Sequence, residues 1–237
     1  MSITYFANLK FRGLTRSILL KDDPFLKIVV TMNAELIVKA HSNPALNSIV
    51  NLNYATFDGR IPELLARFKN PGATFEKISG SDFIYDVAAF CQKKSRKIFL
   101  LGGTAESNCG AVEKLKSRFQ IEVEGYSPPF APFPFEHDLE EDIRQRIIAF
   151  KPDYIFVGFG AVKQELWIQH NMTFLQQLGV KIAVGSGGTF DFVAGTVKRA
   201  PVFIQKMGLE GVYRLIQEPK LFRFKRLLYS LQLFFYS

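Results

Sequence analysis

Residues 97–104 of the chain read Lys-Ile-Phe-Leu-Leu-Gly-Gly-Thr, which places an unbroken apolar run directly before a pair of glycines. Residues 154–158, Tyr-Ile-Phe-Val-Gly, have the same pattern. Runs that are apolar at every position are typical of strands buried on both faces of a parallel sheet. The two segments therefore predict central strands of an α/β fold.

Further runs of this kind alternate with segments of helical length. Strands are predicted at residues 27–31, 48–56, 97–101, 154–158 and 181–185. Helices are predicted at residues 34–40, 81–92, 107–119, 139–150 and 164–178, several of which carry apolar residues at three- and four-residue spacing. This alternation predicts a Rossmann-like, predominantly parallel sheet with helices on both faces. The proline-rich residues 127–134 are predicted to form a loop, because proline fixes φ and removes a hydrogen-bond donor.

Composition narrows the class of protein. The 237 residues are 48% hydrophobic and 22% charged, which suits a globular core. The sequence lacks an unbroken run of the ~20 apolar residues that a membrane-spanning helix needs, so a cytoplasmic, non-spanning chain is expected. Cys91 and Cys109 are isolated and are predicted to be reduced thiols of the core. The histidines are scattered, and we expect neither a metal site nor another cofactor.

The net charge of +8 is concentrated near the C-terminus, where residues 196–237 hold eight Lys and Arg against two Glu. We predict a core at residues 1–195 and a helical, basic, aromatic-rich appendage at residues 196–237. Such a segment can contact nucleic acid, an anionic membrane or a phosphorylated ligand. The mainly apolar residues 227–236 favour a membrane surface over nucleic acid.

Ligands of parallel α/β sheets bind beyond the carboxyl ends of the strands. The pairs Gly102-Gly103 and Gly187-Gly188 occupy such positions, where backbone N–H groups can approach phosphate oxygens, and Asp191 follows the second pair. Tight strand-to-helix turns also favour glycine for conformational reasons alone. The glycines are therefore candidate phosphate ligands with a structural alternative.

Charged and amide side chains follow other predicted strands. Asp58 precedes a glycine and could accept a proton from an attacking hydroxyl, although an Asp-Gly pair is also common in turns and helix caps. Lys163 and Gln164 begin a predicted helix and could bind a phosphate or sugar hydroxyls. Arg199 and Arg214 stand among apolar residues, which favours a role beyond solvation.

Taken in order, these loops resemble the WecG/TagA/CpsF family of bacterial glycosyltransferases. The resemblance extends from about residue 31 to about residue 226. It rests on the strings at residues 31–34, 57–59, 79–82, 101–103, 151–153, 157–160, 163–165, 188–191, 194–195, 199–201, 208–210, 213–215 and 218–219.

The resemblance implies an inverting, metal-independent transfer of a sugar from a UDP-sugar to a polyprenyl-diphosphate-linked saccharide. Its place would be the inner face of the cytoplasmic membrane, in cell-surface polysaccharide synthesis. It implies that Asp58 is the general base, that Thr31, Asn33 and Gln164 line the donor and acceptor pocket, and that Arg214 stabilises the departing diphosphate. Lys77 stands where the family usually has an arginine, so a bidentate phosphate contact is replaced by a point charge.

The sequence leaves two other classes of function open. A dinucleotide-dependent oxidoreductase would use Gly102-Gly103 with Glu122 or Glu124 as the ribose ligand, but the Gly-x-Gly-x-x-Gly fingerprint is incomplete. A nucleic-acid-binding module would use the basic appendage, but its neighbouring apolar run argues for lipid. Gly211 and Leu221 stand where the family's tail usually has a tryptophan and an arginine, and these departures leave room for a homo-oligomeric contact.

Overall fold

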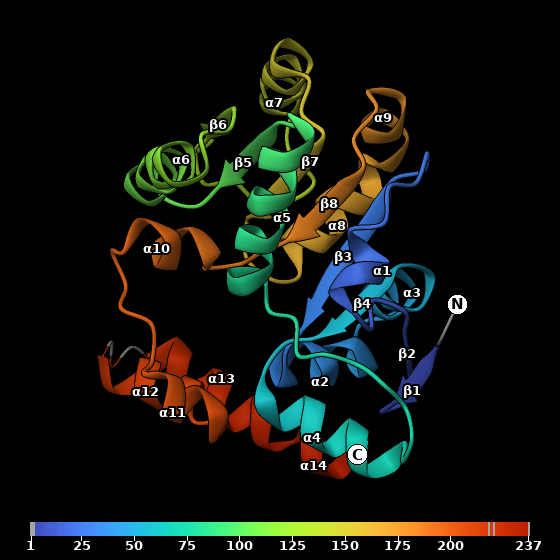
Figure 1. Cartoon of the computed structure of the whole chain (residues 1–237). Helices are drawn as coiled ribbons and strands as arrows, with labels where there is room; N and C mark the ends of the chain where they lie inside the picture. The colour runs from blue at the N-terminus through green and yellow to red at the C-terminus, as the bar shows by residue number, and fades with distance from the viewer. Residues whose placement is uncertain (1–2, 218, 220, 237) are drawn as a thin grey trace. The chain divides into compact units, whose positions relative to one another are not determined.

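Figure 1 shows the structure, a computed structural model that describes residues 3–217, 219 and 221–236. Glu218 and Lys220, two charges of the predicted appendage, lie outside the described residues.

The strands are β1 (Thr4–Phe6), β2 (Leu9–Phe11), β3 (Lys27–Met32), β4 (Tyr54–Phe57), β5 (Ile98–Gly102), β6 (Val123–Tyr126), β7 (Tyr154–Gly158) and β8 (Ile182–Gly185). The first helices are α1 (Arg16–Leu19), α2 (Ala34–Ser42), α3 (Pro44–Leu52), α4 (Arg60–Lys69), α5 (Gly80–Lys94), α6 (Ala105–Phe119) and α7 (His137–Phe150). The remaining helices are α8 (Lys163–His170), α9 (Met172–Gln177), α10 (Thr189–Ala194), α11 (Val202–Lys206), α12 (Glu210–Gln217), α13 (Leu221–Leu231) and α14 (Leu233–Tyr236).

The chain forms two compact units. Unit 1 comprises Met1–Ile18, Val30–Ser79 and Arg199–Ser237, and unit 2 comprises Leu19–Val29 and Gly80–Lys198. The boundary between Val29 and Val30 divides β3, so this strand contributes to both units. The predicted division into a catalytic core at 1–195 and a membrane-associating appendage at 196–237 stays a prediction.

The sheet confirms the expected α/β class. Six strands follow the order β4-β3-β8-β7-β5-β6, and β7 pairs in parallel with both β5 and β8. Every residue of β5 and the first four of β7 are buried, as their unbroken apolar sequences predict. Within unit 2, α5 packs against α6 and α10, and α8 packs against β7 and β8. Figure 1 shows α5 in front of these strands and α8 behind them.

The predicted strand at residues 48–56 is wrong in its first half. Helix α3 extends to Leu52, and strand β4 begins only at Tyr54. Pro44 occupies the start of α3, and the Asn43 side chain caps it by accepting from the Leu46 backbone N–H at 3.0 Å. Ile49 and Val50 continue the buried face that Leu46 begins, at helical spacing. The helix start at Asn43 and Pro44 therefore outweighs the strand preference of the β-branched residues Ile49 and Val50.

The sequence did not predict the edge strand β6, whose Glu124 and Gly125 are exposed and give no apolar run. The predicted helix at 164–178 is two helices, α8 and α9, which meet at Asn171. Of the two thiols expected in the core, Cys91 is buried, but Cys109 lies on the exposed side of α6.

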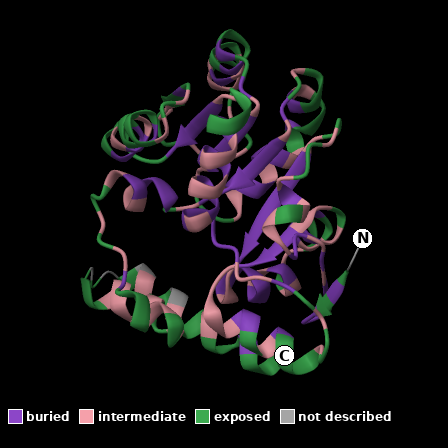
Figure 2. Cartoon of the chain, viewed as in Figure 1, coloured by how far each residue is buried: buried purple, intermediate pink, exposed green. Residues whose placement is uncertain are grey.

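The C-terminal segment is helical, as expected, and in unit 1 it packs against helix α2. Both α13 and α14 contact α2, Leu233 of α14 is 0% exposed, and the Tyr236 ring stacks on His41 of α2 with centroids 4.1 Å apart. By contrast, α11 and α12 contain no buried residue, and Figure 2 shows them as intermediate and exposed. The C-terminal segment is therefore packed against α2 through α13 and α14, whereas α11 and α12 are largely exposed.

Across residues 3–217, 219 and 221–236, none of the helices is both long and apolar enough to cross a bilayer.

The packing of α14 predicts a stability difference between two neighbouring leucines. Leu233→Ala should lower the free energy of unfolding by about 2–4 kcal/mol, because it removes a fully buried side chain. Leu231→Ala, at a position 53% exposed, should change it by less than about 0.5 kcal/mol. Urea unfolding followed by circular dichroism measures both, and equal effects would contradict the packing of α14.

Candidate active site

Unit 1 holds Asp58 at the carboxyl end of β4. The Asp58 backbone N–H donates to the carbonyl oxygen of Met32 at 3.0 Å, which joins the ends of β3 and β4. Gly59 follows at φ 106°, a conformation that glycine adopts readily, and α4 begins at the next residue. The turn leaves Asp58 half-buried at the carboxyl end of the strand.

The other candidates of unit 1 lie on adjoining backbone segments. Asn33 caps α2, its side-chain oxygen accepting from the Leu36 N–H at 2.9 Å, and Thr31 is buried in β3. Lys77 forms a parallel bridge with Phe57, the residue before Asp58. The structure thus brings together the backbone segments of the four predicted residues Thr31, Asn33, Asp58 and Lys77. Lys77 is distant from Asp58 in the sequence, so only the structure shows that their backbone segments adjoin.

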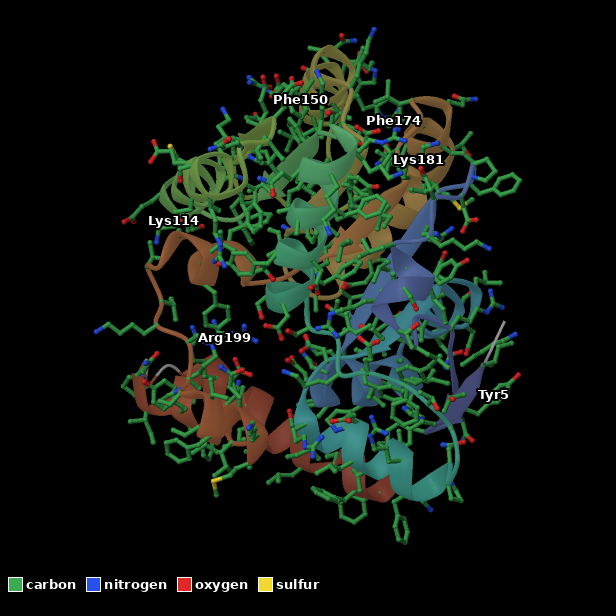
Figure 3. The ribbon with its side chains drawn as sticks, in the orientation of Figure 1. Tyr5, Lys114, Phe150, Phe174, Lys181 and Arg199 are labelled. Carbon is green, nitrogen blue, oxygen red and sulfur yellow. The ribbon has the colours of Figure 1, made fainter. Side chains whose placement is uncertain are left out.

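The C-terminal segment adjoins the helix that follows Asp58. Gly208, at φ 78°, lies so close to α4 that a Cβ there would come within 2.9 Å of the Ile61 side chain. Arg199, labelled in Figure 3, places its Nε 3.7 Å from Oε1 of Glu210 on α12. Arg214 is half-buried on the same helix. The predicted cations Arg199 and Arg214 therefore belong to the same unit as Asp58.

In unit 2, glycines at the carboxyl ends of strands β5 and β7 pack against the ring of Phe190. Gly102 pairs with Gly158 across β5 and β7, and the Gly103 N–H donates to the Gly158 carbonyl oxygen at 3.0 Å. A Cβ at Gly103 or at Gly158 would lie 2.9 Å from the ring of Phe190, which is 1% exposed. Close packing by itself therefore requires glycine at these positions, and phosphate binding at Gly102 and Gly103 stays a prediction.

Gln164 joins two of these turns through its side-chain amide. Its Oε1 accepts from the backbone N–H of Gly160, at 3.2 Å, and from that of Gly187, at 3.0 Å. Its Nε2 donates to the buried Glu165 carboxylate at 2.7 Å. The turn after β7 and the turn after β8 are therefore held in register by one buried amide. Gly188 and Asp191 continue the second turn into α10.

Lys163 lies among aromatic rings of the proline-rich loop and of the turn after β7. Its Nζ donates to the Ala131 carbonyl oxygen at 2.9 Å and stands 4.5 Å from the centroid of the Phe130 ring. The rings of Phe135 and Phe159 are each 5.7 Å away. Burial among these groups lowers the pKa of the Lys163 ammonium from its usual value.

Sequence reasoning missed Asn108, a buried residue of α6. Its Nδ2 donates to the carbonyl oxygens of Leu100 and Gly102, at 3.0 and 2.8 Å, and so supports the glycine turn after β5. The sequence offered no signal for it, because strand β6, whose Gly125 marks the close approach, was not predicted. A Cβ at Gly125 would lie 1.9 Å from Oδ1 of Asn108.

One further contact of α6 supports the end of α10. Lys114 donates to the Ala194 carbonyl oxygen at 2.6 Å, and Figure 3 labels this side chain beside α10. Among the described residues, no group of three or more His, Cys, Asp and Glu is arranged to hold a metal ion.

Comparison with known proteins identifies the family. Residues 3–237 match the family described as Glycosyl transferase WecG/TagA/CpsF. The chain belongs to the WecG/TagA/CpsF glycosyltransferases. The match covers the predicted motifs of both units, so the resemblance inferred from the strings is confirmed.

Named relatives of this glycosyltransferase come from Staphylococcus aureus. The protein of strain MRSA252 is 34% identical over 216 residues, which cover 88% of this chain and 78% of the relative. The protein of strain MW2 is 34% identical over 198 residues, covering 81% of this chain and 72% of the relative. Each is named N-acetylglucosaminyldiphosphoundecaprenol N-acetyl-beta-D-mannosaminyltransferase.

The oxidoreductase hypothesis finds no support in the family match. Glu122, one of its two proposed ribose ligands, forms an ion pair with Lys97 at 2.8 Å.

The Gln164 bridge yields a stability prediction for this glycosyltransferase. Gln164→Leu should lower the free energy of unfolding by about 1–3 kcal/mol, because two backbone N–H groups and a buried carboxylate lose a partner. Gln177→Leu, on the exposed end of α9, is the matched control and should be near neutral. Chemical denaturation monitored by Trp167 fluorescence measures both, and equal stability of the two variants would rule the bridge out as a structural element.

Proposed function

We propose that this chain transfers an N-acetylmannosamine-type sugar from a UDP-sugar to a polyprenyl-diphosphate-linked saccharide, with inversion, in the synthesis of a cell-surface polysaccharide. The observation that carries the proposal is the match over 88% of the chain to a relative named for such a transfer. The acceptor in that relative's name is an N-acetylglucosaminyl diphosphoundecaprenol, and we propose the same chemical class here.

The proposed reaction is a single displacement at the anomeric carbon of the donor sugar. An acceptor hydroxyl oxygen forms the new bond to this carbon, the bond to the UDP oxygen breaks, and the hydroxyl proton passes to the Asp58 carboxylate. The position of Asp58 supports the role of base, because the residue is half-buried at the carboxyl end of a strand, where ligands of parallel α/β sheets bind. Thr31 and Asn33, whose strand ends beside that of Asp58, are proposed to orient the sugar hydroxyls.

The departing diphosphate needs positive charge or hydrogen-bond donors where its negative charge develops. Arg214 is proposed as the principal cation, with Arg199 and Lys77 as further contributors. This proposal is supported by the fact that all three residues belong to unit 1, which also contains Asp58. In this proposal protein cations take the part that a metal ion has in other transferases.

Residues of unit 2 are proposed to bind the donor nucleotide. Gly102, Gly103, Gly187, Gly188 and Asp191 follow strand ends, where ligands of parallel α/β sheets bind. Gln164 holds two of these turns in place, so we assign it to the donor site through the backbone that it orders.

The acceptor carries a lipid tail, so we propose that the enzyme works on the inner face of the cytoplasmic membrane. The C-terminal helices support this, because Phe203 and Phe235 are 64% and 86% exposed and Lys206 and Lys225 are exposed as well. Aromatic rings bury in the headgroup region, and each lysine near an anionic surface adds about 1 kcal/mol. The neighbouring cations Arg199 and Arg214 would then work close to the lipid-linked acceptor.

Asp58→Asn tests the base. The amide keeps the size of the side chain but cannot accept the proton, so kcat should fall by about 10²- to 10⁴-fold while UDP-sugar binding persists. Release of UDP with a short-chain polyprenyl-diphosphate glycoside measures the rate, and calorimetry measures binding. Asp138→Asn, at an exposed position on α7, is the control and should keep normal turnover. Near-normal turnover of the Asp58 variant would remove this residue from the role.

Paired aromatic substitutions test the membrane surface. Phe203→Asp with Phe235→Asp should weaken co-sedimentation with anionic liposomes by about tenfold or more, because two exposed rings lose their burial in lipid. Phe25→Asp, at a phenylalanine 68% exposed in unit 2, should bind liposomes normally. If the paired variant and the control bind alike, the C-terminal helices are not the membrane contact.

A further inference from the structure

The proline-rich loop, residues 127–136, carries a phenylalanine that the packing of the fold does not explain. Phe130 is 95% exposed, so its ring gains almost no burial from the core. The ring instead faces a cation, because the Lys163 Nζ stands 4.5 Å from its centroid. The same Nζ donates to the carbonyl oxygen of the next residue, Ala131, at 2.9 Å. One ammonium group therefore holds two consecutive residues at the tip of the loop.

Both ends of the loop are fastened to the glycine turns of unit 2. At the start, the Ser127 hydroxyl donates to the Gly103 carbonyl oxygen at 2.6 Å. Near the end, the Phe135 ring packs edge-on against Phe159, the residue after β7, with centroids 5.2 Å apart. Phe159 in turn packs edge-on against the buried Trp167. The loop therefore lies along the turns that follow β5 and β7, and Lys163 is its middle attachment.

The strength of this attachment follows from its chemistry. A cation over an aromatic ring, together with a charge-assisted hydrogen bond, stabilises a contact most when the groups are partly removed from water. The Lys163 Nζ meets this condition in part, because it lies within 6 Å of the centroids of three aromatic rings and donates to a carbonyl oxygen. Burial among these groups also lowers the pKa of the ammonium.

We propose that Lys163 is a positioning residue: its ammonium latches the proline-rich loop over the glycine turns of unit 2, and the closed loop forms a wall of the donor-nucleotide site. Lys163 thereby acts through Phe130 and Ala131 and does not itself bind the diphosphate. The inference rests on the proposed function, because it takes the nucleotide of a UDP-sugar as the ligand that the wall encloses.

Loop closure can be measured without any substrate. Lys163→Met removes the charge at similar length, and it should raise the rate of chymotrypsin cleavage after Phe130 or Phe135 by about tenfold. Lys163→Arg keeps both a cation and a donor and should restore protection. Lys93→Met, at an exposed position on α5, is the matched control. Thermal unfolding and Trp167 fluorescence confirm that each variant is folded, and unchanged cleavage of Lys163→Met would overturn the latch.

A second variant separates a latch from a phosphate ligand. Phe130→Ala removes the ring and leaves the Lys163 charge in place, and its exposed position makes misfolding no concern. If the latch acts through the loop, Phe130→Ala should raise KM for the UDP-sugar by about fivefold to tenfold with kcat little changed. The double variant with Lys163→Met should then be no worse than Lys163→Met alone. Phe25→Ala is the control for an exposed phenylalanine of the same unit.

The outcomes distinguish the inference from the proposed function. If Phe130→Ala leaves KM unchanged while Lys163→Met raises it, Lys163 binds the donor directly and the inference is wrong. If cleavage rises but KM stays constant in both variants, the loop is latched but is not a wall of the donor site, which also overturns the inference. If no UDP-sugar is consumed even by the unaltered chain, the proposed function fails, and the cleavage experiment still decides whether Lys163 holds the loop.

Discussion

The close approach of the glycine turns to the ring of Phe190 is the constraint on which the arrangement of unit 2 depends. Gly103 and Gly158 leave no room for a Cβ beside this ring, so the ends of β5 and β7 meet α10 directly. The Gln164 amide then joins the turn after β7 to the turn after β8. Residues with no chemistry of their own thereby set the positions of the backbone groups that we propose face the donor.

In unit 1 the C-terminal segment packs against the helices that follow Asn33 and Asp58, the carboxylate that we propose as the base. Helices α13 and α14 pack on α2, which begins after Asn33, and Gly208 touches α4, which begins after Gly59. The segment that carries Arg199 and Arg214 therefore folds against the helices that follow Asn33 and Asp58. The cations that we propose for the departing diphosphate and the base that we propose thus belong to one packed unit.

Much of this was predictable from sequence. The apolar runs of β5 and β7 determined the class of fold, and the order of the loop motifs determined the family. Asp58 could be named as a candidate because it directly follows a predicted strand, and Gln164 because it begins a predicted helix; the roles of both stay predictions. The edge strand β6 and the helix α3 were not, since Glu124 and Gly125 face solvent and the β-branched residues of α3 suggested a strand. In α3 the cap at Asn43 outweighs the local strand preference. In β6 pairing with β5 outweighs the weak strand preference of its residues.

The sequence by itself thus determined the parallel α/β fold, the glycosyltransferase family and the candidate residues, because periodicity and motif order are written along the chain. Only the tertiary structure decided what those residues touch. Gln164 holds backbone rather than standing open, Lys163 lies among aromatic rings, and Lys77 is beside Phe57. Such contacts join residues far apart in sequence, and they depend on how strands and loops pack, which no local pattern records.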